Sequence, residues 1–349
     1  MFVLHYEYNL KNLNTFGFKC IAKCMLIIED IAEITNVFNE LRTKHNIDIN
    51  YFYKQNKLLI LGGGSNILFA HNYYDGLVIH IKDENINIYA ENKICVSAGY
   101  NWHDFVKWCL KNNFYGLENL ALIPGKVGAC PIQNIGAYGV EAEQYIEQVE
   151  VFNLENNTIE IIYHQNCNFE YRNSIFKQSK KYIILKVYFE FYKNGKNYIP
   201  NIIYKELQNY LDNHQLDISP QNIFNAVIEI RQNKLPDPKI LGNAGSFLKN
   251  PIIDNELLKK LKENYPDIVN FPIDNKHTKI SAGWLIDKAG WKGYIDEINK
   301  IGVYSKQALV LVNYNQENGN VLLELAKKIQ NSVKQKFEIE LEIEVNLIE

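Results

Sequence analysis

Apolar residues recur along the chain with two periods, and the period separates the expected helices from the expected strands. Helical spacing of three and four residues runs through Glu29–Asn46, Trp102–Lys111 and Asn320–Phe337. Shorter apolar or alternating runs are typical of strands, and they cover residues 19–28, 57–61, 76–81, 86–90, 93–98, 148–154, 158–164, 182–192 and 308–312. This mixture of elements predicts an α+β or α/β fold.

A helix bounded by prolines marks the expected boundary between two domains. Ser219 followed by Pro220 gives an N-cap with proline at the first helical position, and the helix should run to about Asn233. Pro236 and Pro238 end it, because the residue before a proline disfavours helical geometry. We therefore expect a domain boundary at Pro236.

The last third of the chain has signals for two capped helices and one alternating strand. Asp254 should cap one helix, and Gly290 should stop another that starts at Ser281. Acidic and apolar residues alternate strictly in Glu338–Val345. That alternation predicts a half-buried strand with its glutamates on one face.

Glycine and proline interrupt the stretch from Gly116 to Glu141 so often that no regular element of ordinary length fits. The stretch reads GLENLALIPGKVGACPIQNIGAYGVE and holds five of the 19 glycines and two of the nine prolines. A long irregular segment inside a domain is usually functional, and its backbone groups need hydrogen-bond partners that a ligand can supply. The stretch is either a loop wrapped around a cofactor or a tight structural crossover.

A second glycine-rich turn, Gly62-Gly63-Gly64-Ser65-Asn66, follows a short apolar run. It is not a Walker A loop, since no Gly-Lys-Ser/Thr follows, and it does not open a helix as GxGxxG does. Successive backbone N–H groups on such a turn form an anion-binding nest, to which Ser65 and Asn66 add side-chain donors. A simple turn would account for the same residues equally well.

Composition narrows the class of protein. The chain has 349 residues, of which 47% are hydrophobic and 22% charged, as in ordinary globular proteins of two or three domains. Its net charge of −3 gives no field that would attract nucleic acid or anionic lipid. We find no apolar run of membrane-spanning length and no signal peptide. None of the six cysteines forms CxxC, so we expect free thiols in the cytoplasm.

Eight segments, in the family's order, resemble the UDP-N-acetylenolpyruvoylglucosamine reductases, in particular the subfamily with a mobile tyrosine loop. They are Asn14-Thr15-Phe16, GGGSN at 62–66, the stretch 116–141, YRNSIFK at 171–177, KLPDPK at 234–239, GNAGSFLKNP at 242–251, SAGWLIDKAGWKG at 281–293 and LEIEV at 341–345. Each segment is weak by itself, but eight in register leave little room for chance.

The resemblance implies a vanillyl-alcohol-oxidase/p-cresol-methylhydroxylase-type FAD-binding domain in two α+β parts, followed by an α+β substrate domain. The corresponding ranges are 1–66 and 67–235 for the two parts (about 17–196 for the FAD module overall) and 236–349 for the substrate domain, whose last strand returns to the active site. The implied FAD contacts are Gly62, Gly63, Gly64, Ser65, Asn66, Pro124, Gly125, Gly128, Gln133, Asn134, Gly136, Ala137, Tyr138 and Gly139.

The implied reaction reduces UDP-N-acetylglucosamine enolpyruvate to UDP-N-acetylmuramate in peptidoglycan precursor synthesis. NADPH reduces non-covalently bound FAD, whose N5 gives hydride to C3 of the enolpyruvyl group before C2 is protonated. Arg172 would bind the substrate carboxylate, and Ser246 would donate the proton to C2. Glu344, with a raised pKa, would help to stabilise or protonate the enolic carboxylate. The implied substrate contacts are Tyr171, Tyr204, Lys234, Asn250 and Gln307.

By pattern alone the three catalytic candidates have commoner interpretations. Arg172 could form a surface ion pair, Ser246 could be a turn hydroxyl, and Glu344 shares a strand face with three other glutamates. The chain also departs from the family in two places. Ile343 stands where the family usually has proline, and Gly63 where relatives can carry an acidic residue; neither departure removes a required group.

Two other functions compete with the reductase. Oxidases on the same FAD fold often tether the flavin to a histidine, but none of the eight histidines lies in the two glycine-rich loops. A catalytically silent nucleotide-sugar-binding protein would lack one of Arg172, Ser246 and Glu344, and all three are present. We expect a monomer that binds FAD, NADPH and the enolpyruvyl nucleotide sugar, with no metal, nucleic acid or membrane partner.

Overall fold

The computed structural model describes residues 1–193 and 198–349 and divides them into two compact units. The first unit comprises Met1–Tyr8, Ala22–Gly63 and Asp75–Arg231. The second comprises Asn9–Ile21, Gly64–Tyr74 and Gln232–Glu349. The GGGSN turn therefore contributes its first two glycines to one unit and its last three residues to the other.

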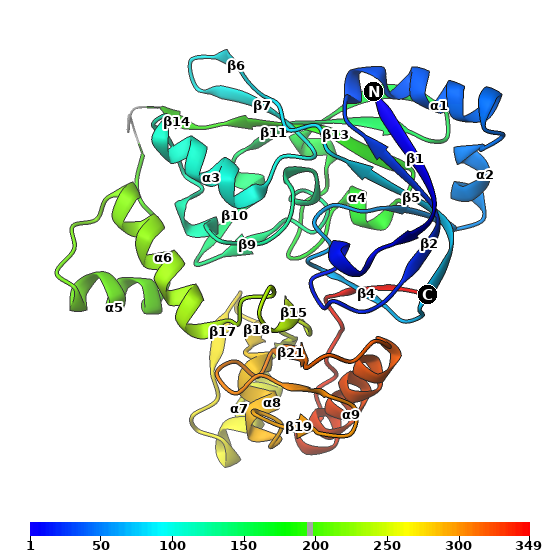
Figure 1. The fold of residues 1–349 in the computed structure, drawn as a ribbon. Helices are drawn as coiled ribbons and strands as arrows, with labels where there is room; N and C mark the ends of the chain where they lie inside the picture. Colours follow the sequence, from blue (N-terminus) through cyan, green and yellow to red (C-terminus); the bar gives the residue numbers. More distant parts are fainter. Residues whose placement is uncertain (194–197) are drawn as a thin grey trace. The chain divides into compact units, whose positions relative to one another are not determined.

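Two sheets form the framework of the first unit (Figure 1). One has the order β1-β2-β5-β3, from β1 (Phe2–Asn9), β2 (Ile21–Ile28), β5 (Tyr73–Ile81) and β3 (Leu58–Ile60), and β3 pairs parallel with β5. The other is antiparallel with the order β12-β11-β13-β7-β6, from β12 (Thr158–Tyr163), β11 (Ile146–Asn153), β13 (Tyr182–Glu190), β7 (Lys93–Ser97) and β6 (Ile86–Ala90). Strands β8 (Phe114–Tyr115) and β14 (Tyr192–Lys193) form a separate short pair.

Amphipathic helices bury their apolar stripes against these sheets. Helix α3 (Trp102–Lys111) places Trp102 and Phe105 in the core, where the ring of Phe105 lies 4.9 Å from that of Phe189 on β13. The side chain of Asn101 starts this helix by accepting a hydrogen bond from the N–H of Asp104. The other helices of the unit are α1 (Ile34–Lys44), α2 (Ile49–Lys54), α4 (Ile175–Gln178), α5 (Lys205–Asn213) and α6 (Pro220–Lys234), of which the residues after Arg231 are counted with the second unit.

The stretch 116–141 lies in the first unit and is irregular, as predicted. It contains two single-turn 3-10 helices, Glu118–Leu120 and Val127–Ala129, and a hairpin of two-residue strands, β9 (Gly136–Ala137) and β10 (Val140–Glu141). Its apolar residues, among them Leu120 and Val127, are buried. The apolar side chains of the stretch thus belong to the core of the first unit.

The second unit has three small sheets, several of whose strands are labelled in Figure 1. Its buried apolar residues form a core of their own. The largest has the order β15-β21-β20-β19, from β15 (Gly242–Ser246), β21 (Val310–Asn313), β20 (Ile301–Val303) and β19 (Ile295–Asp296). The others are β16 (Ile252–Asp254), β18 (His277–Ile280) and β17 (Asn270–Pro272), and the parallel pair of β22 (Asn346–Ile348) with β4 (Ile67–Phe69). Helices α7 (Asn255–Asn264), α8 (Ala282–Lys288) and α9 (Asn320–Phe337) complete the unit.

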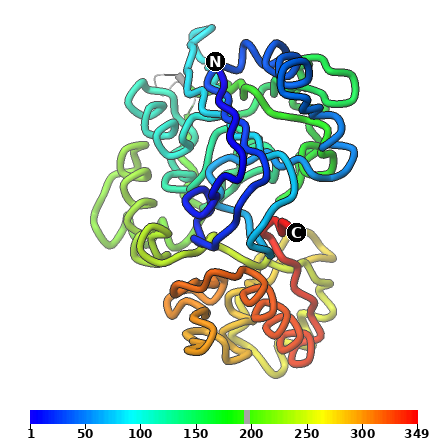
Figure 2. Tube along the Cα trace, turned by 45° about the vertical axis from the view of Figure 1, so that its right-hand side comes forward, coloured from blue at the N-terminus to red at the C-terminus, as the bar shows by residue number. Residues whose placement is uncertain are grey.

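The C-terminal segment returns alongside α9 before it pairs with β4. Figure 2 shows this red segment next to the orange-red helix. The side chain of Gln330 on α9 donates a hydrogen bond of 2.6 Å to the carbonyl oxygen of Leu341. The last residues of the chain are therefore fixed to the turn at 62–66 through the strand that follows it.

Several predictions of elements are confirmed, and one is wrong in extent. Helices α3 and α9 and the β6–β7 hairpin form at the predicted positions, and Ser281 caps α8 as expected. The strand predicted over Glu338–Val345 is instead an extended segment with one bridge, from Leu248 to Ile343, and regular pairing begins only at Asn346. The alternation is reflected in burial, since Ile339, Leu341 and Val345 are buried and the glutamates at 338, 340 and 342 are exposed.

Other local expectations have mixed outcomes. Asp254 occupies the N-cap position of α7, but its side chain makes no capping hydrogen bond. The sequence patterns did not indicate β1, α2 or α5. All six cysteines are free thiols, and five of them are buried. No helix in the described ranges is both long and apolar enough to span a bilayer.

Candidate active site

The two glycine-rich segments approach each other within the first unit. A Cβ atom on Gly63 would lie 3.0 Å from the Cα of Gly125, a separation that real side chains rarely tolerate. Gly125 has a φ of 129°, a conformation that favours glycine. The close approach therefore favours glycine at position 63, and the backbone conformation favours glycine at position 125.

A small, mainly apolar cavity lies beside this contact. It has a volume of about 70 Å³, and both glycine-rich segments contribute to its wall through Gly62 and Gly128. Gly128 is itself tightly packed, because an added Cβ would lie 2.5 Å from that of Ala98. Most of the remaining lining is aliphatic or aromatic, from Ile60, Leu61, Ile81, Ala98, Ala129, Ile132, Phe176, Tyr182 and Ile184, with Lys126. The cavity can admit an apolar part of a ligand beside exposed backbone.

Asn134 holds the following hairpin in shape. It is fully buried with a φ of 44°, and its Nδ2 donates to Oε2 of Glu141 at 2.9 Å. Its Oδ1 accepts from the N–H of Glu143 at 3.1 Å. Burial raises the pKa of Glu141, while the nearby charge of Arg172 lowers it. The amide therefore sets the geometry of the loop instead of facing solvent.

Arg172 lies against this hairpin. Its Nη2 donates to the carbonyl oxygen of Gly136 at 2.8 Å, and its Nη1 donates to that of Asn134 at 3.4 Å. The guanidinium carbon lies 5.1 Å from the ring centroid of Tyr171. Lys177 fixes the backbone by donating to the carbonyl oxygen of Arg172 at 3.0 Å. Arg172 thus makes direct contacts to the glycine-rich loop.

Tyr204 lies near the same hairpin. It occupies the N-cap position of α5, and its ring meets that of Tyr138 edge-on at 5.1 Å. Burial raises the pKa of Tyr138 to about 12, so its phenol is protonated at neutral pH. Ala137 and Gly139 flank Tyr138 in the turn of the hairpin. The first unit thus brings together Arg172, Tyr171, Tyr204 and the predicted cofactor residues of 133–139.

In the second unit, Gly64 packs against the motif Asn14-Thr15-Phe16. Gly64 has a φ of 62°, and an added Cβ would lie 1.9 Å from the carbonyl oxygen of Leu13. Its own carbonyl accepts from the N–H of Thr15 at 3.0 Å. The conformation of the GGGSN turn therefore depends on this N-terminal motif.

The same unit places Glu344 next to both Asn66 and the Ser246 loop. The Nδ2 of Asn66 donates to the carbonyl oxygen of Glu344 at 3.4 Å, and the N–H of Asn346 donates to that of Asn66 at 3.0 Å. The N–H of Glu344 donates to the carbonyl oxygen of Phe247 at 2.9 Å. Ser246 is exposed and Glu344 is half-buried. These contacts bring the serine, the glutamate and the end of the GGGSN turn into one region.

Two of the predicted substrate residues serve local structure in the second unit. Oδ1 of Asn250 accepts from the N–H of Ala282 at the start of α8, at 2.9 Å. Oε1 of Gln307 accepts from the N–H of Leu309 at 3.3 Å and lies against Gly283. Lys234 is the last residue of α6.

The three catalytic candidates are divided between the units: Arg172 belongs to the first unit, whereas Ser246 and Glu344 belong to the second.

Two residues of the stretch 116–141 were missed by sequence reasoning. Glu118 and Asn119 are almost fully buried and hydrogen-bonded to residues 198 and 201 respectively. A charged and an amide residue in a glycine-rich loop are normally expected in solvent. The one available signal was the position of this polar pair between the apolar residues Leu117 and Leu120.

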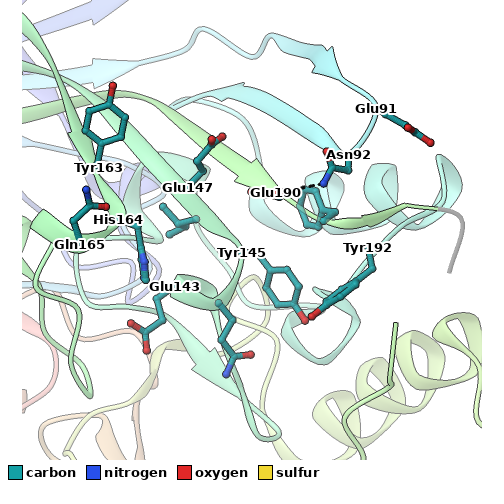
Figure 3. Close-up of a pocket in the computed structure, with 13 residues that line it drawn as sticks. Glu91, Asn92, Glu143, Tyr145, Glu147, Tyr163, His164, Gln165, Glu190 and Tyr192 are labelled. Atoms are coloured by element: carbon teal, nitrogen blue, oxygen red, sulfur yellow. Dashed lines mark hydrogen bonds between the residues drawn. The ribbon is translucent and has the colours of Figure 1, made fainter. Parts of the chain in front are cut away.

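A larger cavity of the first unit, of about 870 Å³, contains none of the predicted residues (Figure 3). Glutamates and tyrosines dominate its wall, among them Glu143, Glu147, Tyr145 and Tyr192. The rings of Tyr145 and Tyr192 pack edge-on at 6.4 Å. A site rich in carboxylates does not suit a diphosphate, so size alone does not identify the active site.

Two family profiles match the chain. One, described as an FAD binding domain, covers residues 48–161. The other, described as the C-terminal domain of UDP-N-acetylenolpyruvoylglucosamine reductase, covers residues 237–348. The α+β fold with an FAD-binding domain is thereby confirmed.

Curated relatives match over nearly their whole length. Proteins named UDP-N-acetylenolpyruvoylglucosamine reductase from Flavobacterium johnsoniae and Amoebophilus asiaticus are 39% and 41% identical, over 98% and 97% of this chain and 98% of each relative. The protein of that name from Pseudoalteromonas atlantica is 42% identical over 97% of this chain and 93% of its own. The crystal structure of UDP-N-acetylenolpyruvylglucosamine reductase from Thermus caldophilus has a similar fold, with a TM-score of 0.67 at 20% identity over 100% of this chain and 99% of that one.

Proposed function

The chain belongs to the UDP-N-acetylenolpyruvoylglucosamine reductase family, and we propose that it reduces UDP-N-acetylglucosamine enolpyruvate to UDP-N-acetylmuramate with NADPH as the reductant. The family makes it an FAD-dependent oxidoreductase. The observation that carries the proposal is identity of 39% to 42% over nearly the full length of proteins with that name. The proposed product is a precursor of peptidoglycan.

The residues of the two glycine-rich segments fit FAD. A side chain at Gly63 would crowd Gly125, and Gly125 has a positive φ, so the backbone at both positions carries no side chain; backbone N–H groups on such turns suit the diphosphate. The cavity beside Gly62 and Gly128 offers an apolar wall to part of the cofactor. When bound and reduced by NADPH, FAD supplies the hydride from N5 to C3 of the enolpyruvyl group.

We assign the substrate carboxylate to Arg172. Its guanidinium is oriented by the carbonyl oxygens of Gly136 and Asn134, so its position is fixed before substrate arrives. Hydride addition at C3 moves negative charge onto the carboxylate as an enolate. A fixed cation stabilises that charge more in the transition state than in the ground state, which is the requirement for catalysis.

We assign protonation of C2 to Ser246, with Glu344 stabilising the enolic carboxylate. A hydroxyl is a weak acid, but an enolate carbon is a strong base, so a positioned serine can transfer its proton. The exposure of Ser246 in its loop and the link from Glu344 to the carbonyl of Phe247 support these roles. Tyr204, Lys234, Asn250 and Gln307 would contact the nucleotide sugar and its diphosphate.

The test is an anaerobic assay of the purified protein. We expect a yellow protein that releases intact FAD on denaturation, oxidises NADPH, and forms UDP-N-acetylmuramate from the enolpyruvyl nucleotide sugar. Flavin that stays attached to denatured protein would support an oxidase with a covalent link instead. Binding of the nucleotide sugar without NADPH-dependent turnover would support a silent binding protein and contradict the proposal.

A further inference from the structure

The segment that leads to Tyr204 is tied to the glycine-rich stretch at two positions before Tyr204 itself. We call residues 198–204 the strap. Tyr198 and Asn201 make hydrogen bonds to the stretch 116–141, and the ring of Tyr204 packs against that of Tyr138. All three of these residues therefore contact the same stretch of the first unit.

Asn119 makes the central connection. It has no exposed surface, and its Nδ2 donates two hydrogen bonds of 2.8 Å, one to the carbonyl oxygen of Tyr138 and one to that of Asn201. These acceptors are 19 and 82 residues away along the chain. Asn201 returns a hydrogen bond of 2.9 Å from its own Nδ2 to the carbonyl oxygen of Gly139. One buried amide therefore joins the hairpin to the strap.

The chemistry of this position favours an amide over similar side chains. Both contacts use the N–H donors of Asn119, and its Oδ1 has no hydrogen-bond partner in the part of the chain that is described. An aspartate would direct acceptor oxygens at two carbonyl oxygens, and an alanine would leave both carbonyls without this donor. A buried amide oxygen without a partner costs free energy, so the two donor contacts of Asn119 must offset that cost.

Glu118 supplies a second connection next to the first. It is 1% exposed, and its Oε2 accepts from the N–H of Gly116 at 2.8 Å and from the hydroxyl of Tyr198 at 2.9 Å. Glu118 and Asn119 thus hold the strap at residues 198 and 201, ahead of Tyr204.

We propose that Asn119 is a positioning residue that sets the place of Tyr204 relative to Tyr138, and that it thereby controls binding of the nucleotide sugar without contacting it. This inference rests on the proposed function, in which Tyr204 contacts the substrate. Loss of Asn119 frees the strap while leaving Gly63, Gly125 and the rest of the cofactor cradle in place. We therefore expect weaker binding of the substrate and an unchanged rate of flavin reduction.

The experiment compares Asn119→Ala with Asn153→Ala as a matched control. Asn153 is also buried and makes two side-chain hydrogen bonds, to Oε1 of Glu160 and from the N–H of Glu155, but it lies at the end of β11. In Asn119→Ala, we expect KM for the enolpyruvyl substrate to rise about tenfold or more, with kcat and flavin reduction by NADPH within about threefold of wild type. Asn153→Ala should leave KM, kcat and the rate of flavin reduction unchanged.

A double-mutant cycle with Tyr204→Phe separates positioning from a general structural role. If Asn119 acts through the Tyr204 hydroxyl, Asn119→Ala should raise KM much less in the Tyr204→Phe background than in wild type. Additive effects on KM, or equal losses in flavin reduction and flavin reoxidation, would overturn the proposal.

Amide hydrogen exchange tests the strap without relying on turnover. Residues 198–204 should exchange about tenfold faster in Asn119→Ala than in wild type or Asn153→Ala, because local opening becomes easier. Unchanged exchange would overturn the inference even for an active enzyme. A wild-type protein that binds FAD but does not bind the nucleotide sugar would overturn the proposed function and, with it, the claimed role of Tyr204, whereas the exchange result would still report on the strap.

Discussion

Arg172 and Gly136 are joined by a hydrogen bond of 2.8 Å from the guanidinium to the backbone carbonyl. The contact connects the cation that we assign to the substrate carboxylate with the loop that we assign to the flavin. Arg172 also has a φ of 54°, which is uncommon for a residue with a side chain. Backbone strain of this kind is retained where surrounding contacts fix it, as the Lys177 contact to the Arg172 carbonyl does here.

Replacing Arg172 with lysine should reduce catalysis while preserving charge. One ammonium cannot hold the carbonyls of Gly136 and Asn134 and also present a planar fork to a carboxylate. We expect kcat/KM for the enolpyruvyl substrate to fall about a hundredfold or more, with flavin reduction by NADPH unchanged. Steady-state and stopped-flow kinetics measure both quantities. Arg42→Lys, on the exposed face of α1, is the control, and equal kcat/KM in Arg172→Lys would contradict the assignment.

Two glycines with nearly the same backbone conformation should respond differently to alanine. Gly64 and Gly245 have φ of 62° and 68°, but only at Gly64 would a Cβ clash, at 1.9 Å from the Leu13 carbonyl oxygen. Gly245→Ala should cost about 1 kcal/mol of unfolding free energy from the left-handed conformation alone. Gly64→Ala should cost about 3 kcal/mol or more, since the backbone must also move. Urea denaturation compares them, and equal losses would show that the clash is relieved elsewhere.

Glu118 should make stability depend on pH. Burial raises the pKa of Glu118 from 4.5 to about 7. Hydrogen bonds, including those from Tyr198 and Gly116, partly oppose this rise in pKa. Tyr145 is a further titratable neighbour of Glu118. The folded state binds the proton of Glu118 more tightly than the unfolded state does, so protonation of Glu118 raises the free energy of unfolding. This contribution is fully present below pH 4.5, is lost as the pH rises through about 7, and is absent at higher pH. The loss is on the order of 3 kcal/mol.

Glu118→Gln imitates the protonated carboxyl and provides the measurement. The variant and wild type should have similar unfolding free energies near pH 5, and the variant should be the more stable by ~2 kcal/mol or more near pH 8. Tyr198→Phe removes a donor to the carboxylate, so it should raise the pKa of Glu118 further and shift the stability change to higher pH. A pH-independent difference between wild type and Glu118→Gln would contradict the burial argument.

The sequence predicted the elements whose signals are local. Helices α3 and α9 were placed correctly because an apolar stripe runs their full length, and Asn101 adds a cap to α3. Helix α5 was missed although Leu207 and Leu211 repeat at helical spacing, since the surrounding residues are polar. The predicted length of the last strand was wrong for another reason. Strand pairing depends on a partner strand, which the alternation of Glu338–Val345 does not reveal.

Two signals led to the candidate site: the glycine- and proline-rich segments, and the motifs that resemble a known family. Glycine marks positions where the backbone conformation or close packing matters, and Gly63 and Gly125 do approach each other closely in the structure. Glu118 and Asn119 could not be found in this way, because their importance comes from burial against residues about 80 positions away. Whether a polar residue is buried depends on the tertiary fold, which local patterns do not report.

The central claim is that Ser246 protonates the substrate after hydride transfer, and it is tested most directly by separating the two half-reactions in an anaerobic stopped-flow instrument. Wild type and Ser246→Ala should both be reduced by NADPH at similar rates. On addition of UDP-N-acetylglucosamine enolpyruvate, the oxidised flavin band should return rapidly in wild type and about a hundredfold more slowly in the variant. Equal reoxidation rates would contradict the role of Ser246, and a wild-type flavin that stays reduced would contradict the proposed substrate.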